Sequence, residues 1–206
     1  MAIKAVIFDW DLTLASTFWF RTRLFWHFCK KTGLPFWSLI RDLRKLFGMT
    51  MFEIFHLQKR ISWAQGLRLY RKEFHEHAGL IRVHVAVLHA LHAQGVKVAV
   101  ISNDMEEHIK WYLEQRGIRI PVFSTNTHPK PNPLILRKML KHLHVMPSEA
   151  VYVGDHPHDI QFGKNAGTRT IGYANLLHGL RSLGKEKPDA VVQSLDEIPS
   201  LIKKFS

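Results

Sequence analysis

Two aspartates, Asp9 and Asp11, stand directly after a short apolar run in the segment AVIFDWDLTL, residues 5–14. The run Ala5 to Phe8 is rich in β-branched and aromatic residues and predicts a buried strand. An unpaired carboxylate in apolar surroundings costs several kcal/mol, so burial does not explain these two residues. They are either ordinary loop residues at a strand end or part of a reactive site.

Similar polar groups follow the other predicted strands. They are Ser102, Asn103 and Asp104 after the run 96–102, Lys130 in the loop after the run 121–124, and Asp155 and Asp159 after the run that begins at residue 150. In an open parallel α/β sheet the carboxyl ends of the strands meet at one edge, where ligands bind. We therefore expect these residues to form one site with the two aspartates.

The residue types at this edge predict phosphoryl transfer. Converging carboxylates repel one another unless a cation lies between them, and oxygen ligands of this kind suit Mg²⁺. A serine hydroxyl, backbone N–H groups and Lys130 would hold the oxygens of a phosphate. A carboxylate nucleophile with a second carboxylate two residues away, as in Asp9 and Asp11, supplies covalent and acid–base catalysis together.

From Val83 onward, helix and strand patterns alternate along the chain. We predict helices over residues 83–94, 105–116, 133–143 and 159–166, and strands over residues 96–102, 121–124, 150–155, 169–174 and 189–194. Strands that alternate with helices of this length predict βαβ units. The expected fold class is therefore α/β, with a doubly wound parallel sheet.

The segment between the first strand and Val83 shows helical spacing at residues 16–33, 35–48, 50–63 and 67–77. This pattern predicts a bundle of about four helices. Its predicted core is aromatic and comprises Phe18, Trp19, Phe25, Trp26, Phe36, Trp37, Phe52 and Phe55. We expect a core domain of residues 1–14 and 83–206, into which residues 15–82 are inserted as a helical domain.

The formal net charge of +12 is unevenly distributed. Between Leu14 and Arg82 there are 13 Lys and Arg against 4 Asp and Glu, a net charge of +9. Such an asymmetry indicates either a surface for an anionic ligand or nucleic acid, or solvated helix faces.

Composition excludes several classes of protein. The single cysteine, Cys29, excludes an internal disulfide, and no apolar run reaches the ~18 residues of a membrane span. Asp9 and Asp11 interrupt the apolar region that a signal peptide would require. We therefore expect a soluble cytoplasmic protein with no membrane partner, while the oligomeric state stays open.

Four segments, DWDLT, ISN, the lysine in HPKPNP, and VGDHPHD, resemble the four motifs of the haloacid dehalogenase-like superfamily in order and spacing. The later segments DIQFGKNAGTRTIGY and PDAVVQSLDEIPSLI resemble its phosphoglycolate phosphatase-like branch. The resemblance covers residues 2–14 and roughly 84–202. Two residues depart from the usual pattern, namely Leu12, where glycine is commonest, and the large Trp10 between the aspartates.

The resemblance implies a Mg²⁺-dependent phosphatase with a Rossmann-like core, acting on a small phosphorylated metabolite. It implies that Asp9 becomes an aspartyl phosphate, and that Asp11 protonates the leaving oxygen and then deprotonates the attacking water. It further implies that Mg²⁺ is held by Asp9, the backbone carbonyl of Asp11, Asp155 and Asp159, and that Ser102, Asn103 and Lys130 bind the phosphate. Residues 15–82 would form a cap that closes over the site.

Other functions stay open on the sequence. A phosphomutase shares the nucleophile and the acid, and a basic nucleic-acid- or protein-binding module could keep a relic of the catalytic core. We expect no nucleic-acid partner, because the set of reactive groups is intact. His156 and His158 are alternative metal ligands, although oxygen ligands already account for the site.

Overall fold

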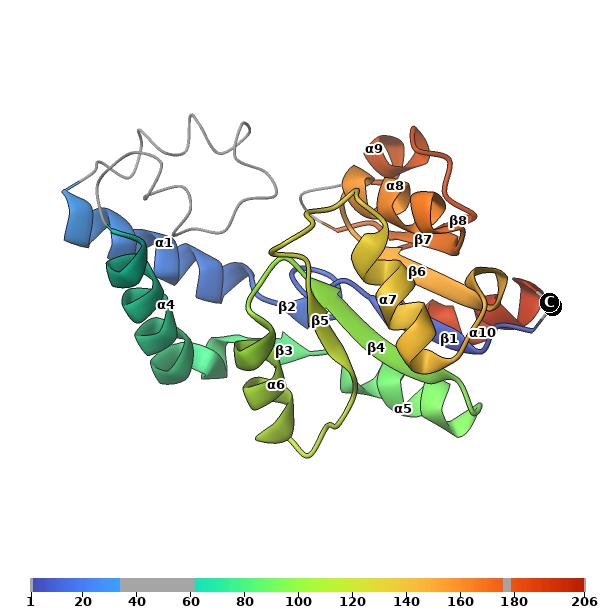
Figure 1. The fold of residues 1–206 in the computed structure, drawn as a ribbon, viewed down its shortest axis with the longest axis horizontal. Helices are drawn as coiled ribbons and strands as arrows, with labels where there is room; N and C mark the ends of the chain where they lie inside the picture. Colours follow the sequence, from blue (N-terminus) through green and yellow to red (C-terminus); the bar gives the residue numbers. More distant parts are fainter. Residues whose placement is uncertain (1, 34–61, 176–178, 206) are drawn as a thin grey trace. The chain divides into compact units, whose positions relative to one another are not determined.

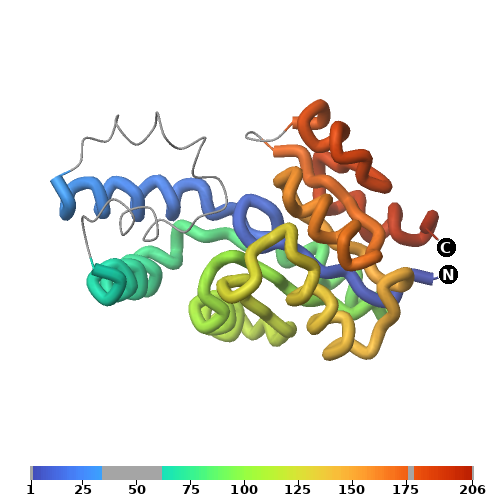
Figure 2. Tube along the Cα trace, turned by 45° about the horizontal axis from the view of Figure 1, so that its top comes forward, coloured from blue at the N-terminus to red at the C-terminus, as the bar shows by residue number. Residues whose placement is uncertain are grey.

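The computed structural model describes residues 2–33, 62–175 and 179–205. Within it the chain divides into two compact units. Unit 1 comprises Met1–Ser16 and Val83–Ser206, and unit 2 comprises Thr17–Arg82. The N- and C-terminal ends of the described chain lie near each other in unit 1 (Figure 2).

A six-stranded sheet forms the centre of unit 1 (Figure 1). Its strands are β1 (Ala5–Phe8), β4 (Lys97–Ser102), β5 (Val122–Ser124), β6 (Ala150–Gly154), β7 (Arg169–Tyr173) and β8 (Ala190–Val192). Their order is β5-β4-β1-β6-β7-β8, and neighbouring strands run parallel. Each of β1, β4 and β6 is buried over almost its whole length, as a strand covered on both faces requires. The predicted α/β fold with a doubly wound parallel sheet is confirmed.

Helices cover the sheet on both faces. The helices of unit 1 are α5 (Val85–Ala93), α6 (Glu106–Glu114), α7 (Leu134–Leu143), α8 (Pro157–Ala166), α9 (Leu180–Gly184) and α10 (Ile198–Leu201). On one face α7 and α8 pack against the odd-numbered residues of β1, including Ala5 and Ile7. Because side chains alternate along a strand, Val6 and Phe8 point to the other face, where α5 packs against β4 and α10.

Two α-helices of unit 2 are described, α1 (Phe18–Thr32) and α4 (Trp63–His77). The predicted helix 67–77 in fact begins four residues earlier. The side chain of Ser62 accepts a hydrogen bond from the backbone N–H of Gln65, and the side chain of Gln65 accepts one from the backbone N–H of Ser62. This reciprocal pair caps the first turn. The predicted helix 35–48 and most of the predicted helix 50–63 lie outside the described residues.

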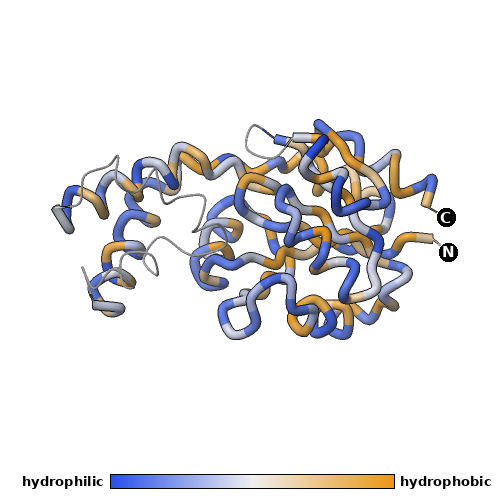
Figure 3. Tube along the Cα trace, turned by 90° about the horizontal axis from the view of Figure 1, so that it is seen from above, coloured by the Kyte–Doolittle hydropathy of each residue, from blue (hydrophilic) through white to orange (hydrophobic). Residues whose placement is uncertain are grey.

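The aromatic core predicted for the insertion is partly wrong. Phe25 is buried as expected, but Phe18, Trp19 and Trp26 are exposed by 47%, 69% and 49%. Hydrophobic and hydrophilic residues alternate along α1 (Figure 3). A helix buries only the side that faces a partner. On α1, Phe20 packs edge-on against Phe74 of α4, whereas Phe18, Trp19 and Trp26 are exposed. Phe36, Trp37, Phe52 and Phe55 lie outside the described residues.

Two further features were not predicted because they are too short to show a period. β2 (Ala15–Ser16) and β3 (Arg82–Val83) form a two-stranded sheet, and α9 has only five residues. Among the described residues, no helix is long and apolar enough to cross a membrane.

The close approach of α8 to the sheet depends on Gly163. A Cβ atom there would lie 2.5 Å from Cγ2 of Thr170 and 3.1 Å from Cβ of Tyr152. We predict that Gly163→Ala lowers the free energy of unfolding by roughly 1–3 kcal/mol, because the helix must move away from β6 and β7. Urea unfolding followed by circular dichroism measures this change.

Gly184→Ala is the matched control, since no atom lies within 4 Å of a Cβ placed at that helical glycine. It should leave stability unchanged or raise it slightly. Equal losses for the two variants would contradict the packing explanation.

Candidate active site

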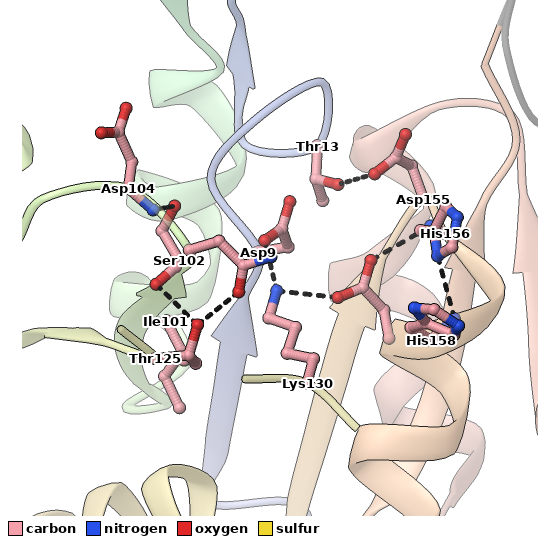
Figure 4. A network of polar contacts seen from close by, with 12 residues as sticks. Asp9, Thr13, Ile101, Ser102, Asp104, Thr125, Lys130, Asp155, His156 and His158 are labelled. Carbon is pink, nitrogen blue, oxygen red and sulfur yellow. Dashed lines mark hydrogen bonds and ion pairs between the residues drawn. The ribbon is translucent and has the colours of Figure 1, made fainter. Parts of the chain in front are cut away.

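The carboxyl edge of the sheet brings together polar residues from several strands. Phe8 pairs with Val100 of β4 and with Val153 of β6, so the residues that follow these positions lie level with one another. Asp9 follows β1, Ser102 ends β4, and Asp155 follows β6. Figure 4 shows Ser102 and Thr125 on one side of Asp9, Asp155 on the other, and Lys130 beside Asp9.

Lys130 joins two of the carboxylates. Its Nζ atom donates to Oδ1 of Asp9 at 2.5 Å and to Oδ1 of Asp159 at 2.8 Å (Figure 4). All three side chains are at most 10% exposed. These partners are 121 and 29 residues away in the chain, so the fold alone brings them together.

The positive charge of Lys130 does not fully compensate the burial and mutual repulsion of the carboxylates in this cluster. Burial raises the pKa of Asp9 well above its usual value of 3.8, and the positive charge of Lys130 only partly opposes this. The negative charges of Asp159, Asp155 and Asp11 raise it further. Burial by itself lowers the pKa of Lys130, but the charges of Asp159 and Asp9 outweigh it and hold that pKa well above 10.5. Lys130 is therefore positively charged, whereas ionisation of Asp9 is less favourable in the folded protein than in water.

The donor set fits a divalent cation. Oxygen atoms of Asp9, Asp155 and Asp159 lie within 4.8 Å of one another, and all three residues are buried. When ionised, three carboxylates beside one ammonium group leave a local charge of −2, which a divalent cation would neutralise. An all-carboxylate set is one that hard cations such as Mg²⁺ or Ca²⁺ prefer.

The turn that carries Asp11 has an unusual backbone. Leu12 has a φ of 57°, in the left-handed region, which costs a residue other than glycine about 1–2 kcal/mol. Trp10, the other departure from the family pattern, is fully buried and packs edge-on against Tyr112 with ring centroids 5.7 Å apart. Its bulk is therefore accommodated inside the fold. Asp11 itself is partly exposed and does not belong to the buried cluster.

Two residues that hold Asp155 were not assigned a role from the sequence. Thr13 donates from Oγ1 to Oδ1 of Asp155 at 3.2 Å, and Asn175 donates from Nδ2 to Oδ2 at 2.8 Å. Asn175 lies two residues after β7, at the same edge of the sheet. The rule that functional groups follow strand ends could have identified it, because the strand before it was predicted.

The residues predicted to bind phosphate lie on the other side of the site. Ser102 is 1% exposed, and its Oγ accepts a hydrogen bond from the backbone N–H of Asp104 at 3.0 Å. Thr125 donates its hydroxyl proton to Oδ1 of Asn103 and its backbone N–H to the carbonyl of Ser102. These bonds hold the loop after β4 against the loop after β5.

The two histidines of the segment VGDHPHD, His156 and His158, lie at the start of α8 and form hydrogen bonds there. Nδ1 of His156 accepts a hydrogen bond from the backbone N–H of His158 at 3.1 Å, so this nitrogen caps the helix. The backbone N–H of His156 donates to Oδ2 of Asp159 at 3.1 Å. A Cβ on Gly154 would lie 2.3 Å from Cβ of Asp159, so only glycine leaves room for this carboxylate.

Comparisons with known proteins show which family and which solved structures this chain is similar to. Residues 6–173 match the family described as haloacid dehalogenase-like hydrolase. A relative from Clostridium perfringens is 30% identical over 99% of both chains. "Pyrophosphatase PpaX" from Bacillus velezensis is 27% identical over 95% of this chain and 94% of its own. The crystal structure of a "predicted phosphatase" from Clostridium acetobutylicum superposes with a TM-score of 0.78, over 99% of this chain and 100% of its own. At 18% sequence identity this similarity shows a shared fold.

The raised pKa of Asp9 generates a prediction about stability. In chelator at pH 7, Asp9→Asn should raise the free energy of unfolding by roughly 0.5–2 kcal/mol, because an amide avoids the penalty for burying this charge. A group with a raised pKa in the folded state contributes stability below its unfolded pKa and loses it as pH rises. The advantage of the variant should therefore vanish near pH 3.8 and grow as pH increases.

Urea unfolding at several pH values measures this difference. Asp196→Asn is the control, because it makes the same change at an exposed aspartate outside the carboxylate cluster. An Asp9→Asn variant that is less stable than the wild type at pH 7 would contradict the electrostatic account.

Proposed function

We propose that this chain, which belongs to the haloacid dehalogenase-like hydrolase family, is a Mg²⁺-dependent phosphatase that forms an aspartyl phosphate on Asp9. The observation that carries the proposal is the buried cluster in which Lys130 bonds to both Asp9 and Asp159, with Asp155 close by. The proposed substrate is a small phosphomonoester.

Asp9 supplies the nucleophile. One of its carboxylate oxygens attacks phosphorus and forms a new P–O bond while the bond to the leaving oxygen breaks, which gives an acyl phosphate. Lys130 holds Oδ1 of Asp9 at 2.5 Å and thereby fixes the orientation of the carboxylate. Its positive charge also reduces the repulsion between an anionic nucleophile and an anionic phosphate.

Asp11 supplies the acid and then the base. In the first step it gives its proton to the leaving oxygen, and in the second it takes a proton from the water that attacks the aspartyl phosphate. That attack releases phosphate and regenerates both carboxyl groups. The partial exposure of Asp11 supports this role, because a group that serves a leaving alcohol and a water molecule must reach both.

Ser102, Asn103 and Lys130 are proposed to bind the phosphoryl oxygens. Ser102 and Asn103 lie in the loop that Thr125 holds in place, so their donors are arranged before substrate arrives. Such preorganised donors stabilise charge on the transferring group without reorganising during the reaction.

Asp9, Asp155 and Asp159, with the backbone carbonyl of Asp11, are the proposed ligands of Mg²⁺. When bound, the ion would neutralise the excess negative charge of the carboxylates and of the phosphoryl group. Thr13 and Asn175 each donate a hydrogen bond to Asp155, and Gly154 leaves the space that Asp159 needs.

We propose that residues 15–82 act as a cap that determines which substrates are accepted. A lid of this kind excludes water and completes the site when it closes. Where the net charge of +9 between Leu14 and Arg82 faces the site, it would favour substrates with more than one anionic group, whereas on outward helix faces it would only be solvated.

Inorganic pyrophosphate is a second candidate substrate. Relatives that align over nearly their whole length are named pyrophosphatase, and pyrophosphate carries several negative charges. The same chemistry applies, with phosphate in place of an alcohol as the leaving group. Measuring phosphate release from pyrophosphate and from a panel of phosphomonoesters under the same conditions distinguishes the two substrate classes.

We predict that Asp9→Asn abolishes phosphate release, because an amide cannot act as this nucleophile. Asp11→Asn should lower kcat by about 10²–10⁴-fold, the usual contribution of general acid–base catalysis. Both variants should retain the circular dichroism spectrum of the wild type. Wild-type rates in either variant would overturn the assigned roles.

The proposed metal dependence gives a further prediction. EDTA should abolish phosphate release and Mg²⁺ should restore it, whereas Ca²⁺ should restore it poorly because its longer bonds loosen the in-line geometry. Steady-state assays with each ion after dialysis against chelator test this. Full activity in EDTA would exclude the proposed role of Asp155.

A further inference from the structure

The side-chain amide of Asn175 contacts two parts of the site at once. Its Nδ2 atom donates to the backbone carbonyl of Leu12 at 3.2 Å and to Oδ2 of Asp155 at 2.8 Å. Leu12 belongs to the turn after β1, and Asp155 follows β6. The amide nitrogen carries two hydrogens, one for each of these acceptors.

We propose that Asn175 is a positioning residue that holds the left-handed turn at Leu12 and orients Asp155 for metal binding. The metal-binding part of this inference rests on the proposed function. Asn175 acts through its two partners and is not assigned any contact with substrate.

The turn at Leu12 needs an external constraint. With a φ of 57°, Leu12 adopts a conformation that glycine enters without strain and that a leucine side chain disfavours. The backbone N–H of Leu14 donates to the carbonyl of Asp9 at 3.2 Å and that of Ala15 to the carbonyl of Trp10 at 2.8 Å. These bonds close the turn from within, whereas Asn175 holds the carbonyl of Leu12 from the loop after β7.

Asp155 also depends on this contact. Its side chain is buried, and each of its two oxygens accepts a hydrogen bond, from Thr13 at Oδ1 and from Asn175 at Oδ2. Two donors on opposite oxygens fix the rotation of the carboxylate. Thr13 follows Leu12 directly, so a change in the turn would disturb both donors together.

The consequence is an energetic coupling between Leu12 and Asn175. Without Asn175, the strained turn can relax, and the relaxation displaces Thr13 from Asp155. With glycine at position 12 the turn is no longer strained, so the loss of Asn175 should matter less. Coupling of this kind between contacting residues is what a double-mutant cycle measures.

The test compares the wild type with Asn175→Ala, Leu12→Gly and the double variant. Isothermal titration with Mg²⁺ alone gives the dissociation constant, and urea unfolding in EDTA gives the midpoint. Asn175→Ala should weaken Mg²⁺ binding at least about tenfold, as is typical when a residue that orients a metal ligand is removed. It should also lower the unfolding midpoint, and both effects should be smaller when residue 12 is glycine.

Two control variants separate positioning from general effects. Gln161→Ala removes another amide-to-carboxylate bond, to Glu186 at 3.1 Å, and should leave the Mg²⁺ dissociation constant unchanged. His144→Gly relieves a second left-handed residue, with a φ of 53°, away from the cluster. It should not alter the effect of Asn175→Ala.

Each outcome decides the proposal. An unchanged Mg²⁺ dissociation constant in Asn175→Ala overturns the metal-binding part, even if stability falls. Equal effects of Asn175→Ala with leucine and with glycine at position 12 overturn the coupling. A wild type that binds Mg²⁺ without releasing phosphate refutes the proposed function but leaves this inference standing. A wild type that binds no Mg²⁺ refutes the metal-binding part, and the unfolding cycle alone then decides the role of Asn175 at Leu12.

Discussion

The burial of several like charges at one edge of the sheet is the constraint on which the rest of this structure depends. Asp9, Asp155 and Asp159 are each less than 10% exposed and lie close enough to repel one another. In a low-dielectric interior such a group is stable only where a positive charge and hydrogen-bond donors offset the desolvation. Lys130 provides the charge within the chain, and the raised pKa of Asp9 shows that it does not offset the whole penalty.

The fold supplies rigid supports for this cluster. A parallel sheet places the ends of β1, β4 and β6 at one level, so the residues that follow them are positioned by strands and not by flexible loops. Glycines then leave the space that the charged groups need. Gly154 makes room for Asp159, and Gly163 lets α8, which carries Asp159, approach the sheet. Lys130 lies 5.4 Å from the ring centroid of Tyr152 and 5.7 Å from that of Phe162, so aromatic faces surround the ammonium group.

The segment that follows β1 shows how two departures from a family pattern are accommodated. Leucine at position 12 brings backbone strain, and Trp10 brings bulk. The bulk is absorbed because Trp10 points into the core against Tyr112. The strained turn accepts a hydrogen bond from Asn175 at the carbonyl of Leu12, and Asn175 also donates to Asp155. Two local changes that a sequence comparison would record as separate therefore both leave the carboxylates of the site in place.

The sequence by itself determined the fold class and the set of polar residues at the strand ends. Runs such as Ala5–Phe8 and Ala150–Gly154 predict buried strands because their composition is a local property, and parallel strands place their ends together by geometry. The tertiary structure alone decided which groups pair. Contacts such as Lys130 with Asp9 and Asn175 with Leu12 join residues more than 100 positions apart, and no local period encodes them. For the same reason periodicity could not show which aromatic residues of α1 face outward, because burial depends on the neighbouring element and not on the helix alone.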